Sequence, residues 1–208
     1  FGLSQDQLAA ALFPGGELTK AEVRRLARER GLPVADKQES QEICFVPDGD
    51  YAGFVDRQAP ALDRSGPIRD LDGRELGRHP GVHRFTLGQR RGLGLTRARP
   101  LYVLAIDAGS RTVVVGDEER LQGDRLVVRD VNWLSIPAPA TEIRAQVRIR
   151  YRHVEVPATV QPLPEGRALV RFDSPQRAIT PGQAAVFYDG ELCLGGGWIE
   201  DRDGGTAE

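Results

Sequence analysis

The hydrophobic pattern of the first sixty residues is that of short amphipathic helices separated by turns. Apolar residues share one helical face from Ser4 to Phe13, and Pro14 ends that pattern. The run Thr19–Glu22 has the form of a capping box, which predicts a second helix that stops near Gly31. A third short helix is predicted from Asp50 to Arg57. We therefore expect a helical N-terminal segment.

From about residue 60 the pattern changes to that of β-strands. Two hairpins are predicted, one at residues 67–77 with a primed turn over Asp72 and Gly73, and one at residues 101–115. A longer strand over residues 125–133 leads to the proline-containing loop 136–140, and further short strands follow. Because five or six short strands in about 70 residues leave exposed edges unless they close, we expect a small barrel.

The predicted fold is mainly β, with a helical N-terminal segment, a small central β domain and a C-terminal β-barrel of the six-stranded type. The expected boundaries are residues 1–62, 63–135 and 136–201, followed by a frayed tail at 202–208. The chain holds no run of about 18 apolar residues, so no membrane partner is expected. It begins without methionine or a leader, from which we expect its natural N-terminus to lie upstream.

Charge is unevenly distributed, although the formal net charge is only −2. Residues 76–106 and 143–154 contain arginine and histidine but no aspartate or glutamate. Arginine far outnumbers lysine, and the guanidinium group suits bidentate contacts with phosphate. An arginine-rich genome would give the same bias, so composition alone leaves a nucleic-acid surface as one interpretation among several.

The second acid-free window predicts a basic strand face. Arg148, Arg150 and Arg152 alternate with apolar residues, and a period of two places the three guanidinium groups on one side of a strand. RNA phosphates would offset the repulsion on such a face. Tyr151 falls on the opposite side, where it could stack on a base but where a core position is the simpler expectation.

The two cysteines, Cys44 and Cys193, lie far apart and form no disulfide framework, which favours a reducing, cytoplasmic location. Glu39 and Glu42 should raise the pKa of the Cys44 thiol. Cys44 is therefore either activated by another part of the protein or a small buried hydrophobe. Cys193, between two leucines, is expected to be a packed structural thiol. No metal site is expected, because there is no CxxC motif and the histidines lack ligand spacing.

Two glycine-rich stretches also admit alternative interpretations. The basic stretch Gly88–Gly94 could cradle phosphates, or it could be a tight connector with solvated arginines. It lacks the Gly-Lys-Ser/Thr ending of a Walker loop. The run Gly195–Gly197 follows a strand but precedes no helix, which favours a bulge or a close backbone approach over an anion site.

Five motifs occur in one order along the chain, at residues 40–45 (SQEICF), 85–94 (FTLGQRRGLG), 150–152 (RYR), 180–188 (TPGQAAVFY) and 193–197 (CLGGG). Together they closely resemble the C-terminal two-thirds of the bacterial tRNA-specific 2-thiouridylase family. The resemblance extends from Leu3 to about Ile199. Five motifs in register are specific where any one of them would be weak.

The resemblance implies an activity and a set of site residues. Enzymes of this family use ATP to activate the C2 oxygen of the wobble uridine in tRNA and replace it with sulfur. By this likeness Cys44 would carry the persulfide, and Arg150, Tyr151 and Gln183 would contact tRNA. Further candidates for tRNA contact are Gln89, Arg90 and Arg91, from the central motif, with Arg148 and Arg152, from the arginine face.

The chain also departs from the family pattern. The Ser-Gly-Gly-x-Asp-Ser loop and the first catalytic cysteine are absent. We therefore expect ATP and Mg²⁺ to bind in a missing N-terminal domain, no cofactor to bind this chain, and the chain alone to be inactive. The expected partners are tRNA and a cysteine desulfurase or sulfur-relay protein. The alternatives are a non-catalytic RNA-binding β-barrel module and a free-standing sulfur carrier.

Overall fold

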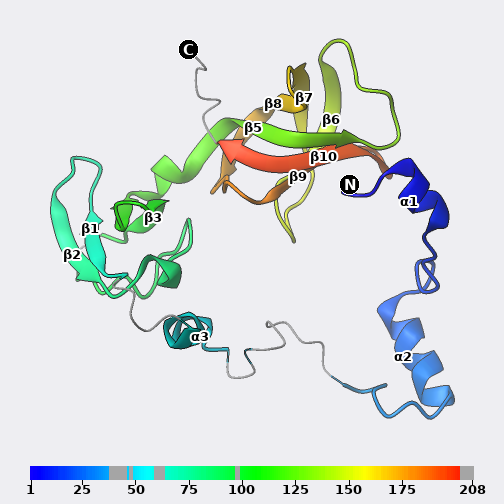
Figure 1. Cartoon of the computed structure of the whole chain (residues 1–208), viewed down its shortest axis with the longest axis horizontal. Helices are drawn as coiled ribbons and strands as arrows, with labels where there is room; N and C mark the ends of the chain where they lie inside the picture. The colour runs from blue at the N-terminus through cyan, green and yellow to red at the C-terminus, as the bar shows by residue number, and fades with distance from the viewer. Residues whose placement is uncertain (38–45, 47–48, 59–63, 97–98, 202–208) are drawn as a thin grey trace. The chain divides into compact units, whose positions relative to one another are not determined.

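In the computed structural model of the chain, residues 1–37, 46, 49–58, 64–96 and 99–201 are described. The chain divides into two compact units, Asp6–Ala61 and the combination of Phe1–Gln5 with Leu62–Glu208. Figure 1 shows short helices in the first unit and strands in the second. The fold is mainly β, with a helical N-terminal segment, a central four-stranded sheet and a closed six-stranded barrel, which confirms the predicted class.

The helical segment contains α1 (Gln5–Ala10), α2 (Lys20–Glu29) and α3 (Tyr51–Gln58). The capping box is present, because the Thr19 hydroxyl accepts the Glu22 amide at 3.3 Å and the Glu22 carboxylate accepts the Thr19 amide at 2.7 Å. Left-handed Gly31 follows the end of α2, as predicted. Among the described helices, none has the length and apolar character needed to cross a membrane.

The central domain is a four-stranded sheet in the order β2-β1-β4-β3, formed by β1 (Gly66–Arg69), β2 (Glu75–His79), β3 (Tyr102–Asp107) and β4 (Thr112–Gly116). Both predicted hairpins are present, and β1 pairs in parallel with β4. The predicted primed turn is wrong, because Gly73 is left-handed but Asp72 is not. The loop is wider, and the Asp70 carboxylate stabilises it by accepting the Arg74 amide at 2.9 Å.

The core of this sheet includes part of the connector between β2 and β3 (residues 80–101). Ile68, Val103 and Val113 on the strands are fully buried, and Phe85 and Leu93 of the connector pack with them. Burial of these two side chains anchors a segment that forms little regular secondary structure of its own.

His79, at the end of β2, is 3% exposed and packs on the ring of Phe85. Its Nε2 donates to the Arg111 carbonyl at 3.0 Å, because a carbonyl only accepts. No described residue forms a hydrogen bond with its Nδ1. Burial holds the pKa of His79 below its usual value, and the nearby charges of Arg78 and His83 lower that pKa further.

The barrel is formed by β5 (Gln122–Trp133), β6 (Ile143–Arg148), β7 (Val156–Leu163), β8 (Arg167–Arg177), β9 (Ala184–Asp189) and β10 (Leu192–Asp201). It closes in the order β10-β5-β8-β7-β6-β9. Strand β5 pairs with both β8 and β10, so the barrel starts at residue 122 and not at the expected 136. The loop at 136–140 lies within the barrel, because alternation along a strand does not say which sheet the strand joins.

Alternation places one set of side chains inside the barrel. Ala145, Val147 and Ile149 point into a core that every barrel strand supplies, and Phe187 at its centre is fully buried. The ring of Phe187 lies 5.7 Å from that of Trp133. The alternating pattern predicted that Ala145, Val147 and Ile149 share one face of a strand, and this prediction is confirmed.

The triple glycine of β10 closes the barrel by a close backbone approach. A Cβ added to Gly196 would lie 2.5 Å from the Ala185 carbonyl oxygen of β9, and one added to Gly195 or Gly197 would overlap a carbonyl oxygen of β5. The pairing register shifts between Cys193 and Gly195, so a bulge accompanies the approach. The interpretation of this run as a close approach and not an anion site agrees with this geometry.

The first residues of the chain are tied to the barrel and not to the helices that follow. The Asn132 side-chain amide donates to the carbonyls of Phe1 at 2.6 Å and Leu3 at 2.9 Å, although these residues lie 131 and 129 positions away in sequence. The Phe1 ring packs edge-on against Trp198, with ring centroids 5.6 Å apart. No local pattern predicted this link.

Replacing Gly196 by alanine should destabilise the barrel. The new methyl group meets backbone of β9, which cannot move without breaking the pairing, so we expect a loss of about 3 kcal/mol in the free energy of unfolding. Chemical denaturation monitored by tryptophan fluorescence measures it. Gly2→Ala is the matched control, because nothing lies within 4 Å of a Cβ at that position. Equal stability of the two variants would contradict close packing at Gly196.

Stability should fall as the pH is lowered from about 7.5 to 5.5. The folded-state pKa of His79 is lowered, so the unfolded chain binds a proton first and acidification favours unfolding. The variant His79→Gln can still donate to the Arg111 carbonyl but does not titrate, so its stability should depend less steeply on pH. The denaturant midpoint of unfolding, measured from about pH 5.5 to 7.5 for both chains, tests this expectation. If the midpoint of the His79→Gln variant depends on pH as steeply as that of the original chain, His79 is not a cause of the pH dependence.

Candidate functional site

Cys44, the predicted persulfide carrier, lies outside the described residues together with Glu39 and Glu42. The structure does place the predicted tRNA contacts, which fall into two groups. One group, here the barrel-end cluster, consists of Arg148, Arg150, Tyr151, Arg152 and Gln183. The other lies on the connector and consists of Gln89, Arg90 and Arg91.

The barrel-end cluster begins where β6 stops. The strand ends at Arg148, and Arg152 adopts a left-handed backbone with φ of 65°. The prediction that alternation continues through residue 152 is therefore wrong, because the chain turns out of the sheet after Ile149. Tyr151 is 83% exposed, so the expected core position is wrong as well. An exposed ring at a turn can offer a face for stacking.

The charge of Arg148 is partly compensated. Its guanidinium group forms an ion pair with Glu155 and lies 5.9 Å from the ring centroid of Tyr188. The two residues that contact the Arg148 guanidinium are held by neighbouring strands, because Tyr188 belongs to β9 and Glu155 immediately precedes β7. Arg148 therefore serves packing as well as charge.

Arg150 and Arg152 have no carboxylate partner within the described part of the chain. Arg150 donates from Nη1 to the Arg177 carbonyl at 2.9 Å, and the Arg152 guanidinium lies 5.5 Å from the Tyr151 ring centroid. A carbonyl contact and a cation–π contact both leave the positive charge in place. The two groups can therefore meet an anion without first breaking an ion pair.

Strand pairing brings Gln183 to the same end of the barrel. The end of β6 lies beside the start of β9, since Arg148 pairs with Val186 in an antiparallel register. Gln183 lies in the turn that precedes β9. Its backbone amide donates to the Thr180 carbonyl, and its backbone carbonyl accepts the Ile199 amide at 2.8 Å. The backbone is thereby fixed while the side chain remains exposed. Residues more than thirty positions apart in sequence thus meet at one edge.

His153 does not add to the charge of this edge at neutral pH. Burial lowers its pKa, and the positive charge of Arg150 lowers the pKa further, although a hydrogen bond with the Gln176 side chain acts in the opposite direction. The neutral imidazole is therefore favoured. The positive potential of the edge comes from the arginines.

On the connector, Gln89 acts as a brace. Its side-chain oxygen accepts the Thr86 amide at 2.9 Å, and its side-chain nitrogen donates to the Arg91 carbonyl at 2.9 Å. Its backbone also bonds to Val103 of β3. Both polar atoms of the amide are used within the loop, whereas the Arg90 and Arg91 side chains are exposed.

Arg177 links the connector side of the protein to the barrel end, and sequence reasoning missed it. Its carbonyl accepts Arg150, while its guanidinium pairs with Glu118 at 3.1 Å and lies 5.6 Å from the Tyr102 ring centroid. Tyr102 in turn donates to Glu118 at 3.2 Å. The ion-pair partners are 59 positions apart, so no local signal in the sequence could have revealed them.

Cys193, on β10, is half-buried and is the one cysteine in the described part of the chain. Its Sγ lies 4.0 Å from the Gly195 carbonyl oxygen. Burial, followed by the neighbouring Cys193, raises the pKa of the Tyr188 phenol. The thiol is thus only partly packed, and its structural role stays a prediction.

Family models match the chain in three consecutive blocks. A tRNA methyl transferase HUP domain matches residues 1–48, and a tRNA methyl transferase PRC-barrel domain matches residues 53–117. An aminomethyltransferase β-barrel domain matches residues 123–199, a range that starts within β5 and ends within β10. The last two blocks coincide with the central sheet and the closed barrel.

Curated relatives are similar over almost the whole chain. The tRNA-specific 2-thiouridylases MnmA of Syntrophotalea carbinolica, Geotalea uraniireducens and Solibacter usitatus are 53%, 51% and 52% identical to it, in each case over 96% of this chain. The chain spans 56%, 53% and 56% of their respective lengths, less than the two-thirds that the motifs suggested. The chain therefore belongs to the tRNA-specific 2-thiouridylase family and spans a little over half the length of these relatives.

Proposed function

We propose that this chain is part of an enzyme that replaces the C2 oxygen of the wobble uridine of tRNA with sulfur. In this proposal the chain supplies the persulfide cysteine, Cys44, and a tRNA-binding surface. The observation that carries it is the exposed ring of Tyr151 between Arg150 and Arg152, which have no carboxylate partner among the described residues. The relatives of the chain are named as tRNA thiouridylases.

The chemistry of the barrel-end cluster suits RNA. Arg150 and Arg152 provide fixed positive charges for phosphates, which position a nucleic acid without reading its sequence. The exposed ring of Tyr151 offers a stacking face for an unpaired base, and the Gln183 side chain can donate and accept hydrogen bonds. Charge, stacking and amide contacts lie at one edge because β6 and β9 are neighbours.

Cys44 would receive sulfur in a balanced exchange. Its thiolate attacks the outer sulfur of a persulfide on a cysteine desulfurase or sulfur-relay protein. The new S–S bond forms on Cys44 while the donor's S–S bond breaks, and the donor leaves as a thiolate. The sulfur atom so held is the one we propose to be passed on to tRNA.

ATP and Mg²⁺, implied by the HUP match and the relatives, do not fit the residues of this chain. The sequence has no Ser-Gly-Gly-x-Asp-Ser loop. Within the described ranges, no group of three or more histidine, cysteine, aspartate or glutamate side chains is arranged to hold a metal ion. No step through nucleotide or metal is assigned to these residues.

Sulfur loading of the 208-residue chain tests the role of Cys44. After incubation with a cysteine desulfurase and cysteine, intact mass should increase by one sulfur atom, and reductant should remove it. Cys44→Ser should abolish the increase, whereas Cys193→Ser, the matched control, should retain it. Sulfur on Cys193 instead of Cys44 would contradict the assignment.

Arg150→Ala should weaken tRNA binding and flatten its dependence on salt. Loss of one phosphate contact makes the slope of log affinity against log salt less negative by about 0.7–0.9. Fluorescence anisotropy with labelled tRNA between about 50 and 200 mM salt measures this slope. Arg144→Ala is the control, because Arg144 is already paired with Asp173 at 2.8 Å. An unchanged slope for Arg150→Ala would remove Arg150 from the phosphate contacts.

The same two measurements separate the alternatives. A non-catalytic RNA-binding module would bind tRNA but take up no sulfur on Cys44. If the chain is a free-standing sulfur carrier, it should take up sulfur, and the unaltered chain should bind tRNA no more tightly than its Arg150→Ala variant. The proposed enzyme part requires both activities in one chain.

A further inference from the structure

A small apolar cluster lies where the end of β8 packs against the central sheet. It is formed by Tyr102 and Leu104 of β3 and by Leu121, which directly precedes β5, and none of them is more than 7% exposed. Leu87 of the connector and Ala178, which directly follows β8, pack against these three side chains. Burial of apolar groups therefore anchors the chain at the end of β8.

The peptide group between Arg177 and Ala178 is held from both sides. Its N–H, on Ala178, donates to the Leu121 carbonyl, and its carbonyl, on Arg177, accepts Nη1 of Arg150, each at 2.9 Å. The N–H and C=O of one planar trans peptide point in opposite directions, so a rotation of this group would break both bonds. Ala178 has a left-handed backbone with φ of 55°, which a residue with a side chain rarely adopts unless its surroundings hold it. The position of the Arg150 guanidinium thus depends on the contacts around Leu121.

The Arg177 side chain is tied to the same short helical turn. The 3-10 helix Glu118–Leu121 has Glu118 at its start and Leu121 at its end. Nε of Arg177 pairs with Oε1 of Glu118 at 3.1 Å, and the Tyr102 hydroxyl donates to Oε2 of the same carboxylate at 3.2 Å. The Arg177 guanidinium also lies 5.6 Å from the Tyr102 ring centroid. Glu118 therefore uses both carboxylate oxygens to hold Arg177 and Tyr102 together.

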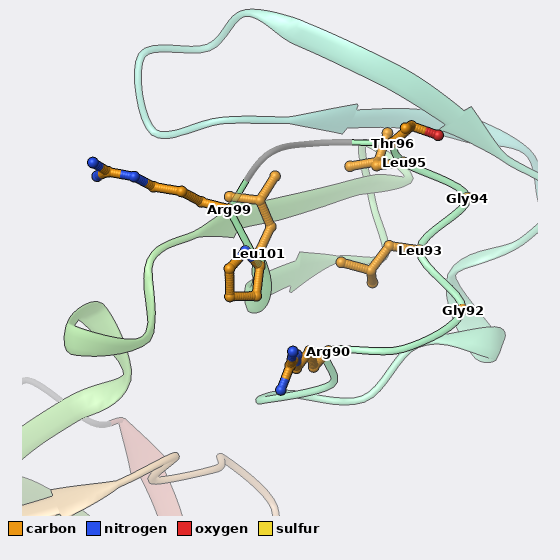
Figure 2. A pocket seen from close by; sticks show the side chains of 9 residues that line it. Arg90, Gly92, Leu93, Gly94, Leu95, Thr96, Arg99 and Leu101 are labelled. Atoms are coloured by element: carbon orange, nitrogen blue, oxygen red, sulfur yellow. The ribbon is translucent and has the colours of Figure 1, made fainter.

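Gly88 brings the start of the connector close to this peptide. A Cβ added to Gly88 would lie 3.3 Å from the Ala178 Cβ and 3.5 Å from Nη1 of Arg177, and the glycine is left-handed with φ of 79°. Farther along, the connector borders a pocket of about 600 Å³, and Figure 2 shows the Arg99 side chain directed away from that pocket. It is therefore the start of the connector, at Leu87 and Gly88, that packs against the end of β8.

The ion pair between Arg177 and Glu118 adds little to stability. The two side chains are 40% and 49% exposed, and pairs this accessible to water contribute little free energy. Pairing does offset the charge of Arg177, whereas no carboxylate among the described residues compensates the charge of Arg150. A neutralised arginine thus lies beside an uncompensated one, an arrangement that suits Arg177 to orienting Arg150 and not to meeting a phosphate itself.

We propose that Glu118 and Arg177 are positioning residues, which hold the Arg150 guanidinium where a tRNA phosphate meets it. This inference rests on the proposed function, and it assigns to a carboxylate a favourable role in binding a polyanion. By its charge alone Glu118 repels RNA, so its removal should tighten binding. By its contacts Glu118 fixes the residue whose carbonyl holds Arg150, so its removal should weaken binding. The two effects have opposite signs, and the sign of the change identifies the role.

Binding of tRNA to the 208-residue chain, measured by fluorescence anisotropy across a salt series, tests the proposal. Glu118→Ala should weaken binding roughly three- to tenfold and make the slope of log affinity against log salt less negative by up to about 0.7–0.9, because the phosphate contact of Arg150 is lost. Glu118→Gln removes the same charge but can still accept hydrogen bonds from Arg177 and Tyr102, so it should restore most of the affinity. Glu119→Ala is the matched control, an exposed neighbour of the same charge, and should bind tRNA at least as tightly as the original chain.

A double-mutant cycle shows whether Glu118 acts through Arg150. In a chain that already carries Arg150→Ala, the change Glu118→Ala should cause no further loss of affinity. Denaturant unfolding should be alike for the Glu118 variants and the original chain, since the exposed pair contributes little stability. Equal affinities of Glu118→Ala and Glu119→Ala, or an equal loss with and without Arg150, would overturn the positioning role alone. An Arg150→Ala variant that binds as tightly as the original chain, or no tRNA binding at all, would overturn the proposed tRNA surface and the positioning role with it.

Discussion

The barrel depends on one close approach, that of the triple glycine in β10 to its neighbours β5 and β9. Side chains at Gly195, Gly196 or Gly197 would overlap backbone atoms, so the ring of strands can close only where these residues have no Cβ. Closure also places Gln183, because the Ile199 amide of β10 bonds to its carbonyl. A packing constraint on one strand therefore fixes a proposed RNA contact on the adjacent turn.

At the end of the barrel, a turn exposes positively charged side chains while the strands hold its backbone in place. Strand β6 supplies inward apolar residues up to Ile149, and the left-handed turn at Arg152 then directs the chain outward. Arg150 would be free to move in such a turn, but the Arg177 carbonyl holds its guanidinium group. Because Arg177 also pairs with Glu118 and packs on Tyr102, the same residue connects the barrel to the central domain.

The arginines that the structure describes are of two kinds: some form ion pairs with carboxylates and others do not. The net charge of the chain is close to zero. On the outer wall of the barrel, Arg144 pairs with Asp173 and Arg171 with Glu142. These exposed pairs contribute little stability, and their main effect is to neutralise the wall. Among the residues that the structure describes, Arg150 and Arg152 of the barrel-end cluster have no carboxylate partner. A local basic surface is thus compatible with a formal net charge of −2.

Periodicity and short motifs in the sequence determined the helices, both central hairpins, the inward set of barrel residues and the family, because each of these signals lies within a few neighbouring residues. They predicted the capping box at Thr19 and the close approach at Gly196. Tertiary structure alone decided that β5 belongs to the barrel, that Tyr151 is exposed and that Arg177 bridges two domains. These features depend on pairings between residues far apart in the chain, and a strand's alternation specifies which side chains are buried but not which strand lies beside it.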